Sequence, residues 1–566
     1  MGPHRRGGSA MLEVVRRWFA TERMTKADVV AGIPGAIGGV PDGMAAGVLA
    51  GVSPVHGLYA SMAGRFFGGF GTSTQLMVVT TTSASALAVG STMSEVEPEQ
   101  RAGAIVMLTL VAGAMMIVAA ILRLGKYTRF VSHSVMTGFL LGISANILFG
   151  QLPSLLGAPV QGALAVQKAL HVMLHPFDFD WRAAVVGIIA VLLLIGLAYT
   201  RLRTVASLFA LIVPMLVVLA FGWNEVGTVA DTGEIPTGIP LPHLPDLSAM
   251  SPSLVFGALA VTVIVLVQGT GVAESAPNPG GSRTSVDRDF TAQGIGNIFA
   301  GLFRGMPVGG SVGQTAINVS SGARGRWGGM WSGLWILVIL VALAGVVGKV
   351  ALPTLAAILM VAAARSVNPD QLSAIWSSGA ISRTALLVTF IATLLLPVTA
   401  AVGVGVGLSL LLQLNQEAMD LRVVRLRVEG DHLVEAKAPK VLSDNEIVIL
   451  DVYGSLFYAG ARTLQAELPD PAGAHDPIVI LRLRGRTSAS STFLHVIGDY
   501  ARRLDALGGR LYLSGVAPHI RDVWTDDLLD AQGLNIEFFP ATSTLGESTL
   551  AAYADAEVRI HREQGH

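Results

Sequence analysis

The chain has 566 residues, of which 52% are hydrophobic and only 14% are charged, and it contains 65 glycines. This composition is rare in soluble proteins and typical of proteins that lie in a membrane. The formal net charge of -1 offers no basic face for nucleic acid, and the absence of cysteine excludes disulfides, thiol nucleophiles and thiolate metal sites.

The N-terminal segment, residues 1–27, is polar and precedes the first apolar stretch. Its basic side chains are Arg5, Arg6, Arg16, Arg17, Arg23 and Lys26. A polar lead of this length is not that of a cleaved signal peptide, and the positive-inside rule predicts that it stays in the cytosol.

The first apolar stretch, residues 28–59, contains Pro34, Pro41 and repeated glycines, which predicts a kinked and closely packed helix. Asp42 follows Pro41 in the middle of this stretch. An ionised carboxylate is costly there unless it faces a cavity or takes up a proton, so we predict that Asp42 binds a coupling ion. The alternative is that Asp42 caps a helix broken at Pro41.

Residues 73–87 join an extended apolar stretch to a cluster of hydroxyl groups at the start of a helix. The cluster consists of Thr80, Thr81, Thr82 and Ser83. A half-helix that begins inside the membrane presents unpaired N–H groups and the positive end of its dipole, which suit an anion. The alternative is that these hydroxyls pack between helices or bond to backbone carbonyls.

Several uncharged runs approach or exceed the ~20 residues that a membrane helix needs. They are residues 102–122, 183–200, 204–223, 254–273 and 328–348, and the run 384–414 is divided by Pro397. Punctuation by proline, glycine and charge gives about fourteen membrane segments between residues 28 and 414. An even number of crossings predicts that everything after Asn415 is cytosolic.

A second interrupted segment, residues 301–318, is again glycine-broken and too short to cross. Its predicted anion-binding residues are Gly309, Gly310, Ser311, Val312, Gly313 and Gln314. Two interrupted helices in separate halves indicate an inverted repeat whose half-helix ends face one another near the middle of the membrane. Glu274 and Asn278 follow the run 254–273 and are assigned to coupling-ion binding, although a helix-end residue meeting water is the alternative for Glu274.

The character of the chain changes after residue 421, where charge density rises and short β-rich runs alternate with helical stretches. The predicted strands are 447–452, 478–483, 510–513 and 536–539, and the predicted helix is 492–507. These elements predict a small soluble α/β domain. The predicted boundaries are a cytosolic N-terminal segment at 1–27, a transport domain at 28–415, a linker and start of the soluble domain at 416–440, the soluble domain at 441–556 and a tail at 557–566.

With these stretches together, the chain resembles the sulfate permease (SulP) family of anion transporters. The segments that carry the resemblance are VPDGMAAGVLAGVSPVHGLY at 40–59, AQGIGN at 292–297, GMPVGGS at 305–311 and GAR at 322–324. The resemblance implies a polytopic α-helical membrane protein with a seven-plus-seven inverted repeat, an elevator-like movement, a homodimer and a cytosolic STAS domain at 441–556. It also implies an anion site at Thr80 to Ser83 and Gly310 to Gly313, with coupling at Asp42 and Glu274.

The chain departs from the family pattern at three places. Gln314 stands where many relatives place an arginine, so we expect a site without its usual fixed cation. Thr80 replaces the usual proline, which puts the donor geometry there in question. The STAS loop at 487–493 keeps its serines without the usual acidic and glycine neighbours, and helix capping by Ser490 or Ser491 is favoured over phosphorylation.

These observations predict a secondary active transporter of a small inorganic anion, sulfate first, coupled to protons or sodium in the plasma (cell inner) membrane. The expected partners are the anion, a proton or sodium ion, the lipid bilayer and a second copy of the chain, with no nucleic acid. We expect no cofactor, no metal site and no enzymatic activity. The alternatives are bicarbonate or a C4-dicarboxylate on the same scaffold, a passive anion channel, and a sensor that signals through the soluble domain.

Overall fold

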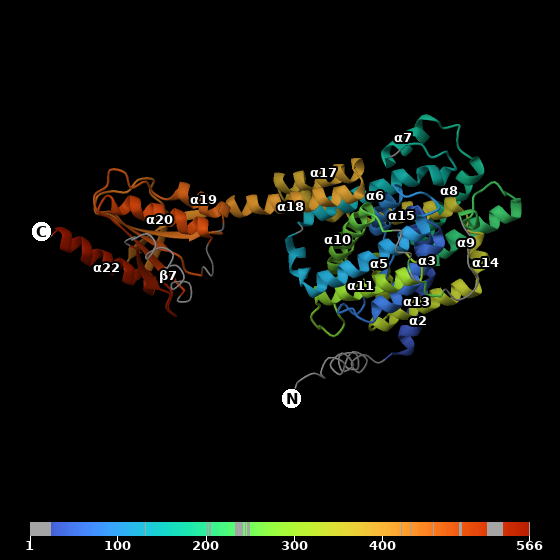
Figure 1. The fold of residues 1–566 in the computed structure, drawn as a ribbon, viewed down its shortest axis with the longest axis horizontal. Helices are drawn as coiled ribbons and strands as arrows, with labels where there is room; N and C mark the ends of the chain where they lie inside the picture. Colours follow the sequence, from blue (N-terminus) through green and yellow to red (C-terminus); the bar gives the residue numbers. More distant parts are fainter. Residues whose placement is uncertain are drawn as a thin grey trace. The chain divides into compact units, whose positions relative to one another are not determined.

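The computed structural model describes residues 24–564 apart from 131, 163, 201, 203–204, 233–240, 244, 246–249, 420, 431, 457, 486–489 and 518–535. The chain divides into two units, a helical unit that ends at Ser409 and a second unit that begins at Leu410 (Figure 1). The division falls close to the predicted boundary at residue 415. The basic residues that precede Lys26, and residues 487–489 of the STAS loop, lie outside the described residues.

The helical unit consists of a bundle of α-helices with two short strands inside it (Figure 1). Its helices are α2 (Lys26–Leu49), α3 (Pro54–Ala63), α4 (Ser83–Met93), α5 (Arg101–Ile121), α6 (His133–Leu156), α7 (Ala165–Leu174), α8 (Trp181–Ala198), α9 (Ala206–Phe221), α10 (Pro252–Ser275), α11 (Val286–Leu302), α12 (Val312–Ser320), α13 (Arg326–Ala342), α14 (Ala344–Gly348), α15 (Leu352–Ser366), α16 (Pro369–Ser377), α17 (Ala380–Leu395) and α18 (Val398–Met419), the last of which continues into the second unit. A single π-helical turn, η1 (Gly64–Gly68), extends α3.

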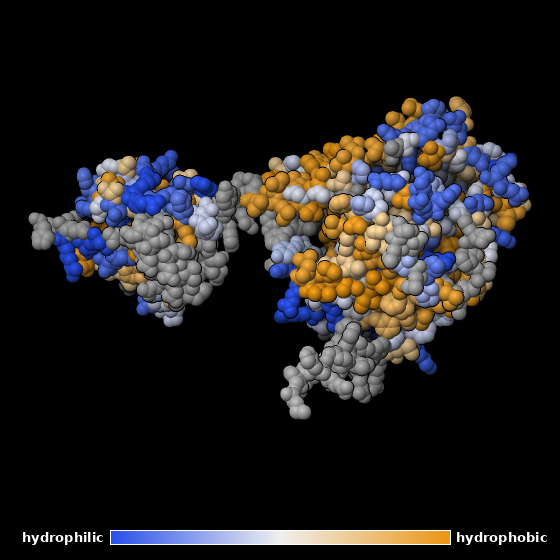
Figure 2. All heavy atoms as spheres, viewed as in Figure 1, coloured by the Kyte–Doolittle hydropathy of each residue, from blue (hydrophilic) through white to orange (hydrophobic). Residues whose placement is uncertain are grey.

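Apolar side chains cover much of the outside of this bundle. Among the described residues, six helices have the length and apolar composition needed to cross a membrane, and four shorter helices are also apolar. Figure 2 shows broad hydrophobic areas on the helical unit, and large side chains such as Leu192, Leu216 and Phe256 are exposed there. Exposure of this kind fits a lipid environment, so the unit is a polytopic helical membrane protein.

The predicted apolar runs correspond to helices with two differences, of which the first is that the stretch 28–59 forms two helices, α2 and α3, and not one. The runs 102–122, 183–200 and 254–273 are confirmed as α5, α8 and α10, and the break at Pro397 is confirmed because Leu396 before it is extended. The run 328–348 is not one helix, since Leu343 leaves the helical conformation between α13 and α14. The alternative of a helix broken at Pro41 is wrong, because α2 continues through it to Leu49.

The first helix is fixed to other parts of the unit at both ends. Thr25 caps α2 in a reciprocal pair of bonds with Asp28, and the Asp28 carboxylate also accepts a hydrogen bond of 3.1 Å from the Arg324 N–H. Near the other end, a Cβ atom on Gly57 of α3 would collide with the Gly43 carbonyl oxygen of α2. The backbones of the two helices are therefore in direct contact.

The two interrupted segments meet in a small sheet. Strands β1 (Val79–Thr80) and β2 (Gly309–Gly310) are antiparallel, with Val79 opposite Gly310 and Thr80 opposite Gly309. The Ser311 N–H donates to the Val78 carbonyl at 3.0 Å and extends the pairing by one bond. Segments from the two halves of the chain thus face one another inside the bundle.

The second unit is a six-stranded sheet with helices on both faces. The strand order is β4 (His432–Lys437), β3 (Arg422–Glu429), β5 (Ile447–Tyr453), β6 (Ile478–Arg482), β7 (Arg510–Val516) and β8 (Ile536–Pro540). Strands β5 to β8 are parallel, and β3 is antiparallel to both of its neighbours. The four predicted strands and the predicted helix, now α20 (Ser491–Asp505), are confirmed, and Ser490 caps α20 by accepting from the Phe493 N–H at 3.2 Å.

Two apolar clusters show which helices cover which face of the sheet. Val448 and Leu450 of β5 pack with α20 and with α19 (Tyr458–Glu467), whereas Ile449 packs with Ala552, Ala556 and Ile560 of α22 (Glu547–Gln564). Because successive strand residues point to opposite faces, α22 covers the face opposite α19 and α20. The residues predicted as a tail from 557 onward are part of α22, because Ile560 extends the buried stripe of this helix. The residues predicted as a linker at 416–440 already contain strands β3 and β4.

Candidate functional site

A half-helix follows each of the two short strands. Helix α4 begins three residues after β1 ends, and Thr82 caps it by accepting from the Ser85 N–H at 3.2 Å. Helix α12 begins two residues after β2 ends, and Ser311 caps it by accepting from the Gln314 N–H at 3.4 Å. Because the strands pair antiparallel, both helix N-termini lie beside the same two-residue ladder.

The first turns of α4 and α12 supply the donors of the candidate site. The N–H groups of Ser83, Ala84, Val312 and Gly313 have no acceptor within their own helices, as in the first turn of any α-helix. Gly313 faces open space, because nothing lies within 4 Å of the position where its Cβ atom would be. Two positive dipole ends with free donors form a site that suits an anion.

Polar residues of α11 hold β2 in place. The Gln293 side-chain oxygen accepts from the Gly310 N–H at 3.0 Å, so this N–H is not free for a ligand. The Asn297 amide bonds both backbone groups of Val308, at 2.9 Å from its N–H and 2.7 Å to its carbonyl. Gly309 packs against Val265 of α10, where a Cβ atom would lie only 2.8 Å from a methyl carbon. The motif at 292–297 thus positions the ladder, and two amides spaced by one helical turn in an apolar stretch are the sequence signal for that role.

Asp42 and Gln314 are brought together across the interface between α2 and α12. The Gln314 side-chain amide donates to an Asp42 carboxylate oxygen at 2.5 Å. Gln314 is buried, and its side-chain oxygen has no hydrogen-bond partner among the described residues. The carboxylate on α2 is therefore joined directly to the half-helix that carries Ser311.

Glu274 and Asn278 lie at and beyond the C-terminal end of α10. Glu274 is exposed in the last turn of the helix. Asn278 is buried, where it accepts from the Gln75 N–H at 2.7 Å and donates to the Ser73 carbonyl at 2.9 Å. These bonds hold the loop that leads into β1. The structure does not join either residue to Asp42 by a hydrogen bond among the described residues.

Arg65 is a residue of this site that the sequence analysis missed. It lies in η1, is only 1% exposed, and donates from Nε to the Thr80 hydroxyl at 3.2 Å. Its Nη1 donates to the Gly35 carbonyl at 3.0 Å and to the Ser332 hydroxyl at 3.1 Å. Its Nη2 has no hydrogen-bond partner among the described residues. A lone arginine in an apolar stretch is the signal that points to it.

Hydroxyl groups continue from Arg65 toward the start of α4. The Thr80 hydroxyl donates to Ser61 Oγ at 3.1 Å, and Ser61 Oγ lies 3.2 Å from Thr81 Oγ1. All three side chains are buried. The structure therefore connects a buried guanidinium to the hydroxyl that directly precedes the cap of α4.

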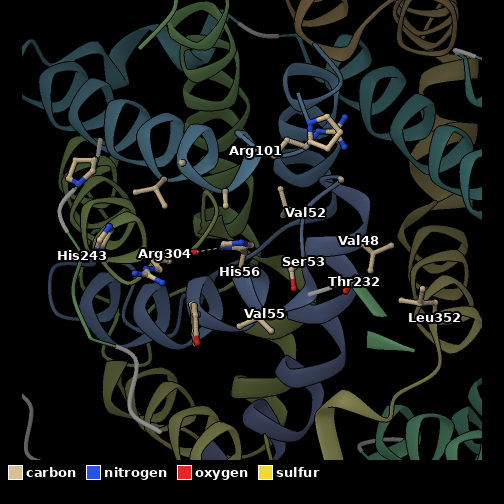
Figure 3. Close-up of a pocket in the computed structure, with 17 residues that line it drawn as sticks. Val48, Val52, Ser53, Val55, His56, Arg101, Thr232, His243, Arg304 and Leu352 are labelled. Carbon is tan, nitrogen blue, oxygen red and sulfur yellow. Dashed lines mark hydrogen bonds between the residues drawn. The ribbon is translucent and has the colours of Figure 1, made fainter. Parts of the chain in front are cut away.

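A separate cavity of about 750 Å³ lies at the C-terminal end of α2 and is lined by Val48, Arg101 and Arg304 among others. Figure 3 shows His56, Arg304 and His243 next to one another along one wall. The His56 ring bonds the Arg304 carbonyl at 2.5 Å, and Arg304 has a left-handed backbone with φ of 60°. No Asp or Glu is among the described residues that line this cavity, so its fixed charges are positive.

A bundle of apolar helices with two half-helices that follow a buried ladder is an arrangement typical of membrane transport proteins. The chain belongs to the sulfate permease family, whose model matches residues 25–392. The Putative sulfate transporter YvdB of Bacillus subtilis (strain 168) is 25% identical over 496 residues, covering 86% of this chain and 91% of that protein. The Bicarbonate transporter BicA of Picosynechococcus sp. is 24% identical over 344 residues, covering 59% of this chain and 61% of that protein.

A solved structure shares the fold along nearly the whole chain. Murine Solute Carrier 26 family member A9, an anion transporter in the inward-facing state, matches with a TM-score of 0.81 at 15% identity over 98% of this chain and 96% of that chain. The family and these relatives are transporters and not enzymes. The chain is therefore a multi-pass anion transporter.

Proposed function

We propose that the chain is a secondary active transporter of a small inorganic oxyanion, with sulfate as its first substrate, driven by symport of a proton or sodium ion. The observation that supports the proposal is the β1/β2 ladder, which joins the two segments that lead into the N-termini of α4 and α12, where free N–H groups lie. Main-chain donors read the charge and size of an oxyanion without requiring a carboxylate or metal partner. The name of the Bacillus subtilis relative supports sulfate.

Asp42 is the proposed coupling residue. It is partly buried on α2 and is bonded to Gln314 of the half-helix that carries the anion site, so a change in its charge acts directly on that site. Protonation of Asp42 removes a negative charge next to an entering anion and so favours anion binding. Glu274 stays a second proposed coupling residue and Asn278 a third, although their placement at the end of α10 supports them less.

The proposal includes the architecture that the family resemblance implies. It comprises about fourteen membrane segments in a seven-plus-seven inverted repeat divided into core and gate regions, an elevator-like movement, and a homodimer. The second unit is proposed to be a STAS domain in the cytosol together with the N-terminus, in the plasma membrane. The mixed sheet with helices on both faces supports the domain assignment.

Transport into proteoliposomes tests the coupling. We expect vesicles containing the purified protein to accumulate labelled sulfate against its gradient when the outside is acidified or sodium is added outside. Asp42→Asn, which keeps the shape and a hydrogen bond to Gln314, should abolish the response to the driving gradient while sulfate exchange continues. If sulfate accumulation by the parent protein does not respond to the proton gradient or to the sodium gradient, the symport hypothesis is wrong. Unitary channel currents would indicate a passive channel instead.

Bicarbonate is the second candidate, because BicA is among the relatives and because backbone donors do not select one oxyanion chemically. Competition of unlabelled bicarbonate, sulfate and a C4-dicarboxylate against one tracer at fixed pH separates these substrates. The anion with the lowest half-inhibitory concentration is the better substrate. Complete inhibition by bicarbonate at concentrations where sulfate has no effect would reassign the cargo.

A further inference from the structure

We propose that Arg65 is the fixed cation of the anion site and that it acts through an ordered chain of hydroxyl groups ending at Thr81. The inference deepens the proposed function, and it rests on that function because it takes the N-termini of α4 and α12 as the anion site. Gln314 does not supply a positive charge to this site. Arg65 is a positioning residue here, since it reaches the anion through other side chains.

The hydrogen bonds have a defined direction because a guanidinium only donates. Arg65 Nε donates to Thr80 Oγ1 at 3.2 Å, which leaves the single Thr80 hydrogen to go to Ser61 Oγ at 3.1 Å. Ser61 Oγ lies 3.2 Å from Thr81 Oγ1, where either hydroxyl can donate, and in the proposed chain Ser61 is the donor. Thr81 then has its hydroxyl hydrogen free to donate to an anion at the start of α4. Each bond polarises the next, so the cation strengthens the last donor in the chain.

The charge of Arg65 is buried among neutral partners. The groups that accept from its guanidinium are the Thr80 hydroxyl, the Gly35 carbonyl and the Ser332 hydroxyl. Its Nη2 has no partner among the described residues, and the side chain is 1% exposed. Among the described residues Arg65 forms no ion pair, and Asp42 interacts with it only through space. A buried charge without a paired carboxylate is costly, and a bound anion lowers that cost.

Asp42 is the carboxylate of α2 that lies nearest to this guanidinium along the helix. Gly39 gives Arg65 its space, because a Cβ atom there would collide with the guanidinium, and Asp42 follows one helical turn later. The carboxylate is bonded to Gln314 and not to Arg65. The Arg65 guanidinium therefore packs against the same stretch of α2 that carries Asp42, and neutralising Asp42 leaves the positive charge for the anion to compensate.

Two departures from the family pattern are explained together by this arrangement. Thr80 supplies a hydroxyl that a proline at the same position does not have, and this hydroxyl is the acceptor of Arg65 Nε. Gln314 is uncharged, and Arg65 supplies a positive charge from another element. The Arg65–Thr80 bond and the neutral side chain at Gln314 are together consistent with a fixed cation on η1 and not on α12.

Anion affinities of purified protein test the proposal. Dissociation constants for sulfate and for chloride are measured by titration calorimetry at one pH on the parent, Arg65→Gln, Arg65→Lys and Ser61→Ala. We expect Arg65→Gln to raise the dissociation constant for sulfate by about tenfold or more, which is the range for a lost hydrogen bond to a charged group. The dissociation constant for chloride should rise by less. Arg65→Lys should recover part of the sulfate-to-chloride preference because it keeps the charge.

Ser61→Ala interrupts the chain without touching Arg65, so it decides the question even where an arginine variant does not fold. It should weaken the binding of both anions. The double variant Ser61→Ala/Arg65→Gln should bind them no more than about twofold more weakly than Arg65→Gln alone, because both changes interrupt the same chain of hydroxyl groups. Ser332→Ala is the matched control, because Ser332 bonds Arg65 Nη1 but lies outside the chain. It should leave both affinities within about twofold of the parent.

Two results would overturn the inference. One is a sulfate dissociation constant within twofold of the parent in Ser61→Ala and in a folded Arg65→Gln variant. The other is an equal loss of affinity for sulfate and for chloride in Arg65→Gln, together with a loss in the double variant that equals the product of the two single losses. An arginine with a purely structural role would produce that result. Gly313→Val separates this failure from failure of the proposed function: if it abolishes binding, the site stands without Arg65, and if it leaves binding unchanged, the anion site lies elsewhere.

Discussion

The glycines around the ladder differ in what they contact, and this difference decides at which of them a substitution tests the anion site and not the packing. Gly309 and Gly310 lie against α10 and Met77, so a side chain at either position would disturb packing as well as the site. Gly313 in the first turn of α12 meets nothing within 4 Å. It is therefore the position at which the site can be filled with the least disturbance to the fold.

We expect Gly313→Val to abolish anion binding and transport with little loss of stability, because its side chain would occupy the space beside the free N–H groups of α12. Flux in proteoliposomes and the thermal midpoint of the purified protein are the two measurements. Gly403→Val on α18 is the matched control, since Gly403 also has nothing within 4 Å and is exposed. Normal flux in Gly313→Val, or equal loss in both variants, would contradict the assignment.

At the scale of elements, the contact between α2 and α3 depends on the absence of a side chain at Gly57. We expect Gly57→Ala to lower the unfolding free energy by about 1–3 kcal/mol, the usual cost of overpacking, because the helices must separate from one another. The thermal midpoint reports the change. Gly103→Ala in α5, which meets nothing within 4 Å, should leave the midpoint unchanged or raise it slightly. An unchanged midpoint in Gly57→Ala would show that α3 shifts without cost.

Local signals predicted most of the elements, whereas tertiary contacts decided the exceptions. Pro397 ends a helix as expected, but α2 tolerates Pro34 and Pro41 because neighbouring helices pack closely around its glycines. The two half-helices were predicted from their glycines and hydroxyls. The role of Arg65 was not, because its bonds reach three segments as distant as Ser332, 267 positions away, and no local pattern encodes such contacts.

At the scale of the whole transport unit, the cavity at the C-terminal end of α2 carries a positive field. Arg101 and Arg304 line it, and no carboxylate is among its described lining residues. A concave surface of one charge raises the local concentration of the opposite ion and speeds its entry. The cavity should therefore lower the KM for anions that arrive from the side of this cavity only.

We expect the double variant Arg101→Gln/Arg304→Gln to raise this KM roughly threefold to tenfold without changing the maximal rate, because the field acts on encounter and not on translocation. Uptake by vesicles with one protein orientation, measured from each side, gives both constants. Arg101→Lys/Arg304→Lys should keep the parent KM, and added salt should shrink the difference. Equal changes from both sides would assign these arginines a structural role.

The β1/β2 ladder also sets the order in which the molecule can be made. Val78 and Thr315, which bond beside the ladder, are 237 positions apart, so nearly half of the chain must emerge after the first strand before its partner exists. Contacts of such sequence separation form late, and domains during synthesis mature from the N-terminal side. A nascent chain stopped before Gly309 can insert its early helices, but it has no second half-helix, so the proposed anion site can form only after more than half of the chain has been made.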